Sequence, residues 1–149
     1  VRFNLPIIVS THPRTQDRLT KLNLKTNPLV RFEKPFGFFD YVALQQQACC
    51  VLSDSGTITE ESSILNFPAL NLREVHERPE GMEESSVMLV GLNEERILQA
   101  LSVLQSQARG SKRDLSLVSD YAPLNVSEKV LRIILSYTDF VNRKIWKKT

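Results

Sequence analysis

The segment Ser53-Asp54-Ser55-Gly56-Thr57-Ile58-Thr59-Glu60-Glu61 decides the fold of this chain. It follows an apolar run at residues 48–52 that predicts a buried strand, and it leads into residues 58–65, which predict a helix. A strand that turns through Ser-Gly into a helix presents unpaired backbone N–H groups at the helix start. Those groups and the helix dipole favour an anion, typically a phosphate.

Two carboxylates, Glu60 and Glu61, lie in the first turn of this predicted helix, where a phosphate alone does not require them. They suggest a ligand that also carries hydroxyls, such as the ribose of a nucleotide. The alternative is a capping box, in which Thr57 is the N-cap and Glu60 reaches back to it. The local sequence leaves both interpretations open.

The composition of the 149 residues is that of one soluble globular domain, with 42% apolar and 24% charged residues. A net charge of +2 is too small to argue for nucleic acid. No apolar run approaches the roughly 20 residues that span a bilayer, so no membrane segment is predicted. Cys49 and Cys50 fall in a predicted strand and are interpreted as buried thiols rather than redox or metal groups, which favours a reducing, cytoplasmic location.

Short predicted strands alternate with predicted helices along the chain. The strands are expected at residues 5–10, 28–32, 48–52, 69–72 and 87–90, and helices at 14–24, 39–48, 58–65, from 93 and 125–147. Residues 107–124 show no clear period and are interpreted as a mobile loop. The alternation predicts an α/β fold with a parallel sheet covered on both faces by helices.

Ligands bind such sheets at the carboxyl ends of the strands. His12, Ser55 and the segment 73–78 each follow a predicted strand and should lie at that edge. His12 suits a phosphate contact or proton transfer, or it caps the next helix. Arg78 has a planar fork suited to a diphosphate, or it belongs to a solvated run of charges.

Aromatic residues cluster at 36–41, where Tyr41 offers a face to a flat base. For Phe36, Phe38 and Phe39 a place in the core is the favoured interpretation. The histidines and cysteines lack metal-ligand spacing, so no metal site is predicted. The chain has neither a G-x-G-x-x-G nor a Walker pattern, which weighs against NAD and against a P-loop site; no cofactor is predicted.

Two motif blocks together resemble the non-hydrolysing UDP-N-acetylglucosamine 2-epimerase family. They are Ser53-Asp54-Ser55-Gly56 with Glu60-Glu61, and, after Pro68, Glu77-Arg78-Pro79-Glu80. Further segments, at residues 11–14, 34–41, 76–82 and 125–129, resemble the branch that makes UDP-N-acetyl-L-fucosamine for capsule and O-antigen, the UDP-2-acetamido-2,6-dideoxy-L-talose 2-epimerases.

The resemblance implies a Rossmann-like half of a glycosyltransferase-B-type fold, which binds UDP-sugar in the cleft between two halves. The chain matches the second half and is expected to start inside it. Residues 1–124 would form a partial Rossmann-like UDP-binding domain without its first strand–helix unit. Residues 125–149 would form a long helix that crosses to the missing N-terminal domain, and its apolar stripe allows the fragment to self-associate.

The resemblance also implies contacts with the diphosphate and the sugar. Ser55 and Gly56 would hold the diphosphate at the helix start, and Arg78 and His12 would contact the diphosphate or the sugar side. Many family members have a second glycine where this chain has Thr57, which leaves direct backbone contact at that position in doubt.

For the nucleoside, the resemblance implies that Glu61 binds the ribose hydroxyls. Tyr41 would stack near the uracil, with Phe36 beside its edge. Thr57 and Glu60 would then keep the capping role, while the residues on either side of them carry the ligand.

The chemistry implied is inversion at C2, in which UDP is eliminated to leave a 2-acetamidoglycal and is then returned. The carboxylates that move the C2 proton would lie in the first half, so His12 and Arg78 are expected to stabilise the leaving group, and this chain alone should be inactive. The full-length enzyme is expected to be a homodimer. The alternatives are the nucleotide-sugar half of a glycosyltransferase and a non-catalytic UDP-binding module.

Overall fold

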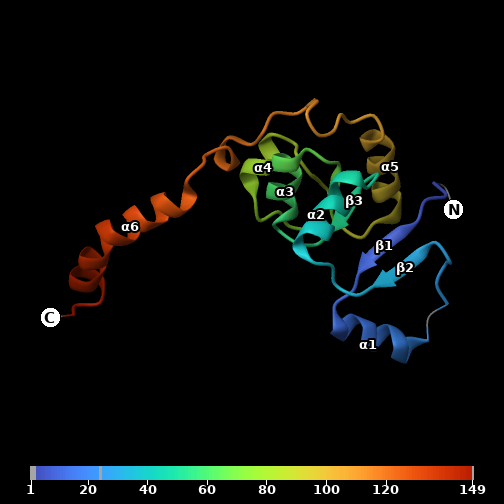
Figure 1. Ribbon diagram of the computed structural model, residues 1–149, viewed down its shortest axis with the longest axis horizontal. Helices are drawn as coiled ribbons and strands as arrows, with labels where there is room; N and C mark the ends of the chain where they lie inside the picture. The colour runs from blue at the N-terminus through green and yellow to red at the C-terminus, as the bar shows by residue number, and fades with distance from the viewer. Residues whose placement is uncertain (1–2, 24, 149) are drawn as a thin grey trace. The chain divides into compact units, whose positions relative to one another are not determined.

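The structure is a computed structural model that describes residues 3–23 and 25–148 (Figure 1). It divides into a first unit, Val1–Ala48, and a second unit, Cys49–Thr149. The first unit contains β1 (Ile7–Ser10), α1 (Pro13–Leu22), β2 (Val30–Glu33) and α2 (Phe38–Gln47). The second contains β3 (Val51–Ser53), α3 (Ile58–Leu65), β4 (Ala69–Asn71), α4 (Pro79–Glu83), β5 (Met88–Leu89), α5 (Glu94–Leu104), a 3₁₀ turn η1 (Ser119–Tyr121), α6 (Val126–Phe140) and a π-helical turn η2 (Val141–Ile145).

The first unit is a parallel strand pair with its connecting helix. β1 and β2 pair in register from Ile7 opposite Val30 to Ser10 opposite Glu33. α1 follows β1 because Pro13 is well placed in a first helical turn, and the helix ends at Asn23 in the left-handed conformation (φ 46°). This is the predicted order of strand, helix and parallel strand.

Burial in the first unit differs from the prediction. Ile7 and Ile8 of β1 are 52% and 46% exposed, although the β-branched run predicts a buried strand. Within this unit β1 pairs only with β2, and α1 buries none of its residues. Phe38 and Phe39 are 76% and 84% exposed at the start of α2, so the core interpretation of these two rings is wrong.

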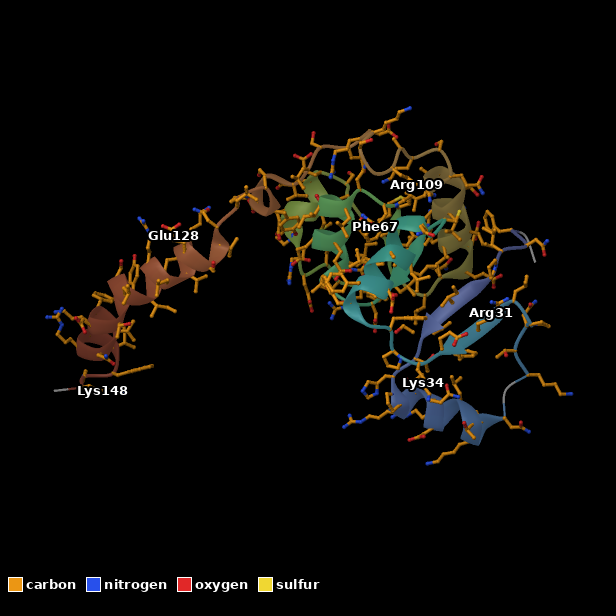
Figure 2. All side chains as sticks on the ribbon, viewed as in Figure 1. Arg31, Lys34, Phe67, Arg109, Glu128 and Lys148 are labelled. Atoms are coloured by element: carbon orange, nitrogen blue, oxygen red, sulfur yellow. The ribbon has the colours of Figure 1, made fainter. Side chains whose placement is uncertain are left out.

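The second unit has a three-stranded parallel sheet in the order β3-β4-β5. The central strand β4 is completely buried, and its alternate residues face opposite sides. Ala69 packs with Phe67 and with Ile58 of α3, whereas Leu70 packs with residues of α5. Phe67 lies in the interior of this unit (Figure 2). Helices therefore cover both faces of this sheet, as predicted.

Two local signals give the helix boundaries that the sequence predicts. Asn66, before Phe67 and Pro68, ends α3 in the left-handed conformation (φ 53°). The Oδ1 of Asn93 accepts a hydrogen bond from the Arg96 N–H at 3.0 Å and so caps α5.

The segment between α5 and α6 is irregular, but it is anchored to α3. The guanidinium of Arg113 donates to the carbonyls of Ser63 and Ile64, each at 2.7 Å. The Val118 N–H donates to the Ser63 hydroxyl at 3.0 Å, and the Val118 side chain is only 1% exposed. Arginine satisfies the last carbonyls of a helix, so this segment, which is predicted as a mobile loop, has fixed contacts with α3 at Arg113 and Val118.

The predicted C-terminal helix is present as α6 followed by η2, and none of the α6 residues is buried. Asn125 occupies the N-cap position with φ 55° and makes no side-chain cap bond. Instead its amide lies 3.4 Å from the carboxylate of Glu128. None of the described helices is both long and apolar enough to cross a membrane.

The two cysteines precede β3, which begins only at Val51. Cys49 is exposed and Cys50 half-buried, so the prediction of two buried thiols fails for Cys49. Burial raises the pKa of the Cys50 thiol to about 12, and the neighbouring Cys49 adds to the shift.

Replacing Leu70 by alanine should lower the free energy of unfolding by about 2 to 5 kcal/mol, because the side chain is 0% exposed and its loss leaves a cavity. The matched control is Leu135→Ala on α6, where the side chain is 71% exposed and the effect should stay within about 0.5 kcal/mol. Urea denaturation followed by circular dichroism measures both. Equal losses would contradict the described core.

Iodoacetamide at pH 8 should label Cys49 much faster than Cys50. The thiolate is the nucleophile, and with a pKa of about 12 the Cys50 thiol is ionised in roughly one molecule in ten thousand at that pH. Mass spectrometry of Cys49→Ser and Cys50→Ser variants separates the two rates, and labelling in urea is the control. Equal rates in the folded variants would contradict the burial of Cys50.

Candidate anion-binding site

The turn from β3 into α3 is closed by its own hydroxyl groups. The Ser53 hydroxyl accepts a hydrogen bond from the Ser55 N–H at 3.1 Å. The Ser55 hydroxyl accepts from the Thr57 N–H at 3.3 Å and lies 2.9 Å from the Thr57 hydroxyl. Two of the backbone donors in this turn are thus engaged within it, so fewer remain for an anion than the sequence pattern alone suggests.

The predicted capping box between Thr57 and Glu60 is absent. Thr57 occupies the N-cap position with helical angles (φ −66°, ψ −15°) and makes no side-chain cap bond. Oε1 of Glu60 instead accepts from Nε of Arg78 at 2.6 Å. This bond is charge-assisted on both sides, since a guanidinium donates to a carboxylate, and it takes the place of the predicted cap.

Arg78 stands beside the start of α3, at the N-cap position of α4. Its backbone N–H donates to Nδ1 of His76 at 3.1 Å, and its Nη1 donates to the Glu77 carbonyl at 3.2 Å. A Cβ placed on Gly56 would lie 3.8 Å from the Arg78 guanidinium carbon and 3.1 Å from Glu77 Oε2. The two motif blocks predicted to act together therefore meet within the second unit, and the missing side chain of Gly56 leaves room for that approach.

The charged side chains around Arg78 have separate partners. Glu77 pairs with Arg73 at 2.7 Å, and the hydrogen bond from Arg73 lowers the pKa of the Glu77 carboxyl. This half-exposed pair matches the alternative of a solvated charge run. Arg78 does not fit that alternative, because its bond to Glu60 joins two segments 18 residues apart.

Tyr121 reaches this cluster from η1, and nothing in the sequence pattern predicts it. Its hydroxyl donates to Oε1 of Glu80 at 2.7 Å. This bond is the main cause of the lowered pKa of the Glu80 carboxyl, whereas burial is the main cause of the raised pKa of Tyr121. The only local signal is an aromatic residue within a polar, aperiodic segment.

His12, Phe36 and Tyr41 belong to the first unit. The exposed His12 accepts the Arg14 N–H on Nδ1 at 3.2 Å and caps α1, which is the alternative role considered for it. Phe36 and Tyr41 are half-buried.

Glu61 is a half-buried member of the first turn of α3 in the second unit, next in sequence to the Glu60 that contacts Arg78. Within the second unit, the structure brings Gly56 of the Ser55-Gly56 turn beside Arg78. Across residues 3–23 and 25–148, no three histidine, cysteine or carboxylate side chains are grouped as a metal ion needs.

A helix start beside an arginine, next to the carboxyl end of a parallel strand, is typical of α/β proteins that bind nucleotides or other phosphate compounds. The chain belongs, more specifically, to the UDP-N-acetylglucosamine 2-epimerase family, whose model matches residues 1–135. The predicted family is therefore confirmed.

Individual relatives agree with this assignment. A UDP-N-acetylglucosamine 2-epimerase of Methanocaldococcus jannaschii is 36% identical over 114 residues, which are 74% of this chain and 31% of the relative. The solved structure of the enzyme of that name from Rickettsia bellii is 50% identical, with a TM-score of 0.88 over 99% of this chain and 40% of the other. The M. jannaschii structure in complex with UDP-GlcNAc and UDP is 32% identical, with a TM-score of 0.77 over 91% of this chain and 37% of the other.

These solved structures have the glycosyltransferase-B-type fold, and this chain corresponds to its C-terminal half. The predicted fold class is confirmed. The chain spans about a third of the length of the curated relatives that it matches.

Replacing Tyr121 by phenylalanine should raise the pKa of the Glu80 carboxyl toward its ordinary value, because the hydroxyl that stabilises the carboxylate is lost. A carboxyl group whose pKa is lower in the folded state stabilises the fold at pH values above its unfolded-state pKa. This contribution disappears as the pH falls through the folded-state pKa. The stability difference between wild type and variant should therefore be present at neutral pH and vanish in acid. NMR titration of the side-chain carboxyl carbon measures the pKa directly.

The control is Tyr137→Phe on α6, whose ring packs against Phe140. It should leave the Glu80 titration unchanged. An unaltered Glu80 pKa in Tyr121→Phe would show that the hydrogen bond does not form in solution.

Proposed function

We propose that this chain is the UDP-binding half of a UDP-N-acetylhexosamine 2-epimerase. The observation that carries the proposal is the position of the Arg78 guanidinium beside Gly56, at the start of α3. A fixed positive charge and a helix start together offer a diphosphate both charge neutralisation and hydrogen-bond donors. Family membership and the relative solved with UDP-GlcNAc and UDP support the choice of ligand.

In the proposed reaction, the C1–O bond of the sugar breaks and UDP departs with the electron pair, while a base removes the C2 proton. The product is a 2-acetamidoglycal. Reprotonation of C2 on the opposite face and return of UDP to C1 complete the epimerisation. Negative charge grows on the departing diphosphate, and donors placed in advance for that charge lower the barrier.

The proposed roles of this chain's residues all concern the leaving group and the nucleoside. Ser55, Gly56 and Arg78 hold the diphosphate, and His12 contacts the diphosphate or the sugar. The remaining proposed contacts are Glu61 with the ribose hydroxyls, Tyr41 with the uracil face and Phe36 with its edge. The acid and base that move the C2 proton are proposed to lie outside these residues, so this chain by itself should turn nothing over.

Within the family, we propose the branch that makes UDP-N-acetyl-L-fucosamine for bacterial capsule or O-antigen, on the motif segments 11–14, 34–41, 76–82 and 125–129. UDP-GlcNAc is the competing substrate, because the relatives reported above are named UDP-N-acetylglucosamine 2-epimerases. A cytoplasmic location is part of the proposal, because two free thiols fit a reducing compartment.

We further propose that residues 1–124 are a partial UDP-binding domain and that residues 125–149 cross to another half, with a homodimer as the working enzyme. The uncovered apolar surface of α6 supports this arrangement, since it needs a covering partner. The second candidate function is the nucleotide-sugar half of a glycosyltransferase, and the third is a non-catalytic UDP-binding module.

Incubation with a UDP-sugar and no acceptor separates these functions. The protein as its gene encodes it should convert UDP-2-acetamido-2,6-dideoxy-L-talose to its C2 epimer and incorporate deuterium at C2 from D₂O, as followed by NMR. Faster conversion of UDP-GlcNAc would assign the chain to the other branch. Turnover only with an added acceptor would favour the glycosyltransferase, and binding without turnover the non-catalytic module.

The Arg78→Ala variant should bind UDP roughly 10 to 100 times more weakly, which is the effect expected for losing hydrogen bonds from a charged group. Glu61→Ala should also weaken UDP binding, because its proposed contacts with the ribose hydroxyls are lost. Arg96→Ala and Glu95→Ala on the exposed start of α5 are matched controls that should retain full affinity. Unchanged calorimetric affinity in both site variants would refute the placement of UDP.

A further inference from the structure

We propose that Glu60 is a positioning residue for the diphosphate site: it does not touch UDP, but holds Arg78 by Nε and thereby presents the two terminal nitrogens of the guanidinium. This inference rests on the proposed function, because it takes the diphosphate as the ligand of Arg78. It departs from the role predicted for Glu60 as part of a helix cap.

The contact geometry supports a role in orienting Arg78. A guanidinium has five N–H donors in one plane, on two distinct edges. Glu60 engages the Nε edge at 2.6 Å, while Nη1 lies near Gly56 and donates to the Glu77 carbonyl at 3.2 Å. Both Arg78 and Glu60 are about one-third exposed or less, at 34% and 27%, so this pair is more restrained than a fully solvated one.

Glu60 itself is poorly placed to bind a nucleotide. Its Oε1 is taken by Arg78, and its Oε2 is buried without a hydrogen-bond partner among the described residues. A carboxylate also repels a diphosphate unless a cation neutralises it. The carboxylate therefore faces Arg78 and the protein interior, which fits a supporting role behind the arginine.

The neighbouring carboxylates have other partners. Glu77 is bonded to Arg73 at 2.7 Å, and Glu80 accepts from Tyr121 at 2.7 Å. The Arg78–Glu60 bond links α3 directly to the segment before α4 through charged side chains. Removing Glu60 should thus release the arginine from its position beside Gly56.

The test compares UDP with uridine, which lacks the diphosphate. Glu60→Ala should lower the affinity for UDP roughly tenfold and leave that for uridine within about twofold, because only the diphosphate contacts depend on Arg78. Glu60→Gln keeps an acceptor for Nε and should recover most of the UDP affinity. The control Glu95→Ala removes a first-turn carboxylate from α5 and should change neither affinity.

A double-mutant cycle completes the experiment. In the Arg78→Ala background, adding Glu60→Ala should cause no further loss of UDP affinity, since the residue to be positioned is gone. A parallel loss of UDP and uridine affinity would indicate a merely structural role and overturn the proposal. So would additive losses, stronger UDP binding by Glu60→Ala, or a Glu60→Gln variant no better than Glu60→Ala.

The same measurements separate this proposal from the function on which it rests. Failure of the wild-type protein to bind UDP would overturn the proposed function, and an Arg78→Ala variant with full affinity would overturn the placement of the diphosphate beside Arg78 together with the role of Glu60. A weakened Arg78→Ala variant beside an unaffected Glu60→Ala variant would overturn only the role of Glu60. Should Glu60→Ala prove unfolded by circular dichroism, the Glu60→Met variant decides, because it keeps the length of the side chain but offers Nε no strong acceptor. Selective loss of UDP affinity then supports the role, and no loss, or equal loss for uridine, overturns it.

Discussion

The ion pair between Glu60 and Arg78 is the interaction on which the candidate site depends. It connects the first turn of α3 to the residue before α4, and so brings the Ser-Gly turn and the charged block after β4 to one place. A surface ion pair of this length would contribute little to stability. Its importance here lies in geometry, because it determines which edge of the guanidinium is available beside Gly56.

The ion pair can be maintained because the elements that carry it are tied to a common core. β4 is buried along its whole length, with the α3 side chains on one face and those of α5 on the other. The segment after α5 adds a second connection. It bonds the last carbonyls of α3 through Arg113 and reaches Glu80 of α4 through Tyr121. The segment after α5 therefore links α3 and α4, the two helices that carry the candidate site.

The sequence predicts what depends on local signals. The order of strands and helices, the stop at Asn66, the cap at Asn93 and the meeting of two motif blocks all follow from short patterns. It does not predict which partner a versatile side chain chooses. The sequence offers Glu60 a partner in the local helix cap, whereas Arg78 lies 18 residues further along the chain. Only the fold brings Arg78 to Glu60. Tyr121 and Arg113 were likewise missed, because an aperiodic segment gives no sign of its anchor points.

The sequence also overestimates burial in the first unit, and the distribution of buried residues bears on function. Within residues 3–23 and 25–148, the buried apolar side chains all belong to the second unit, whereas β1 and the start of α2 expose Ile7, Ile8, Phe38 and Phe39. A β-branched or aromatic side chain is buried only where another element of the fold covers it. The candidate anion site is therefore built on the best-packed part of the chain. The role proposed for Arg78 depends on that support, because a displaced donor loses most of its effect on a growing charge.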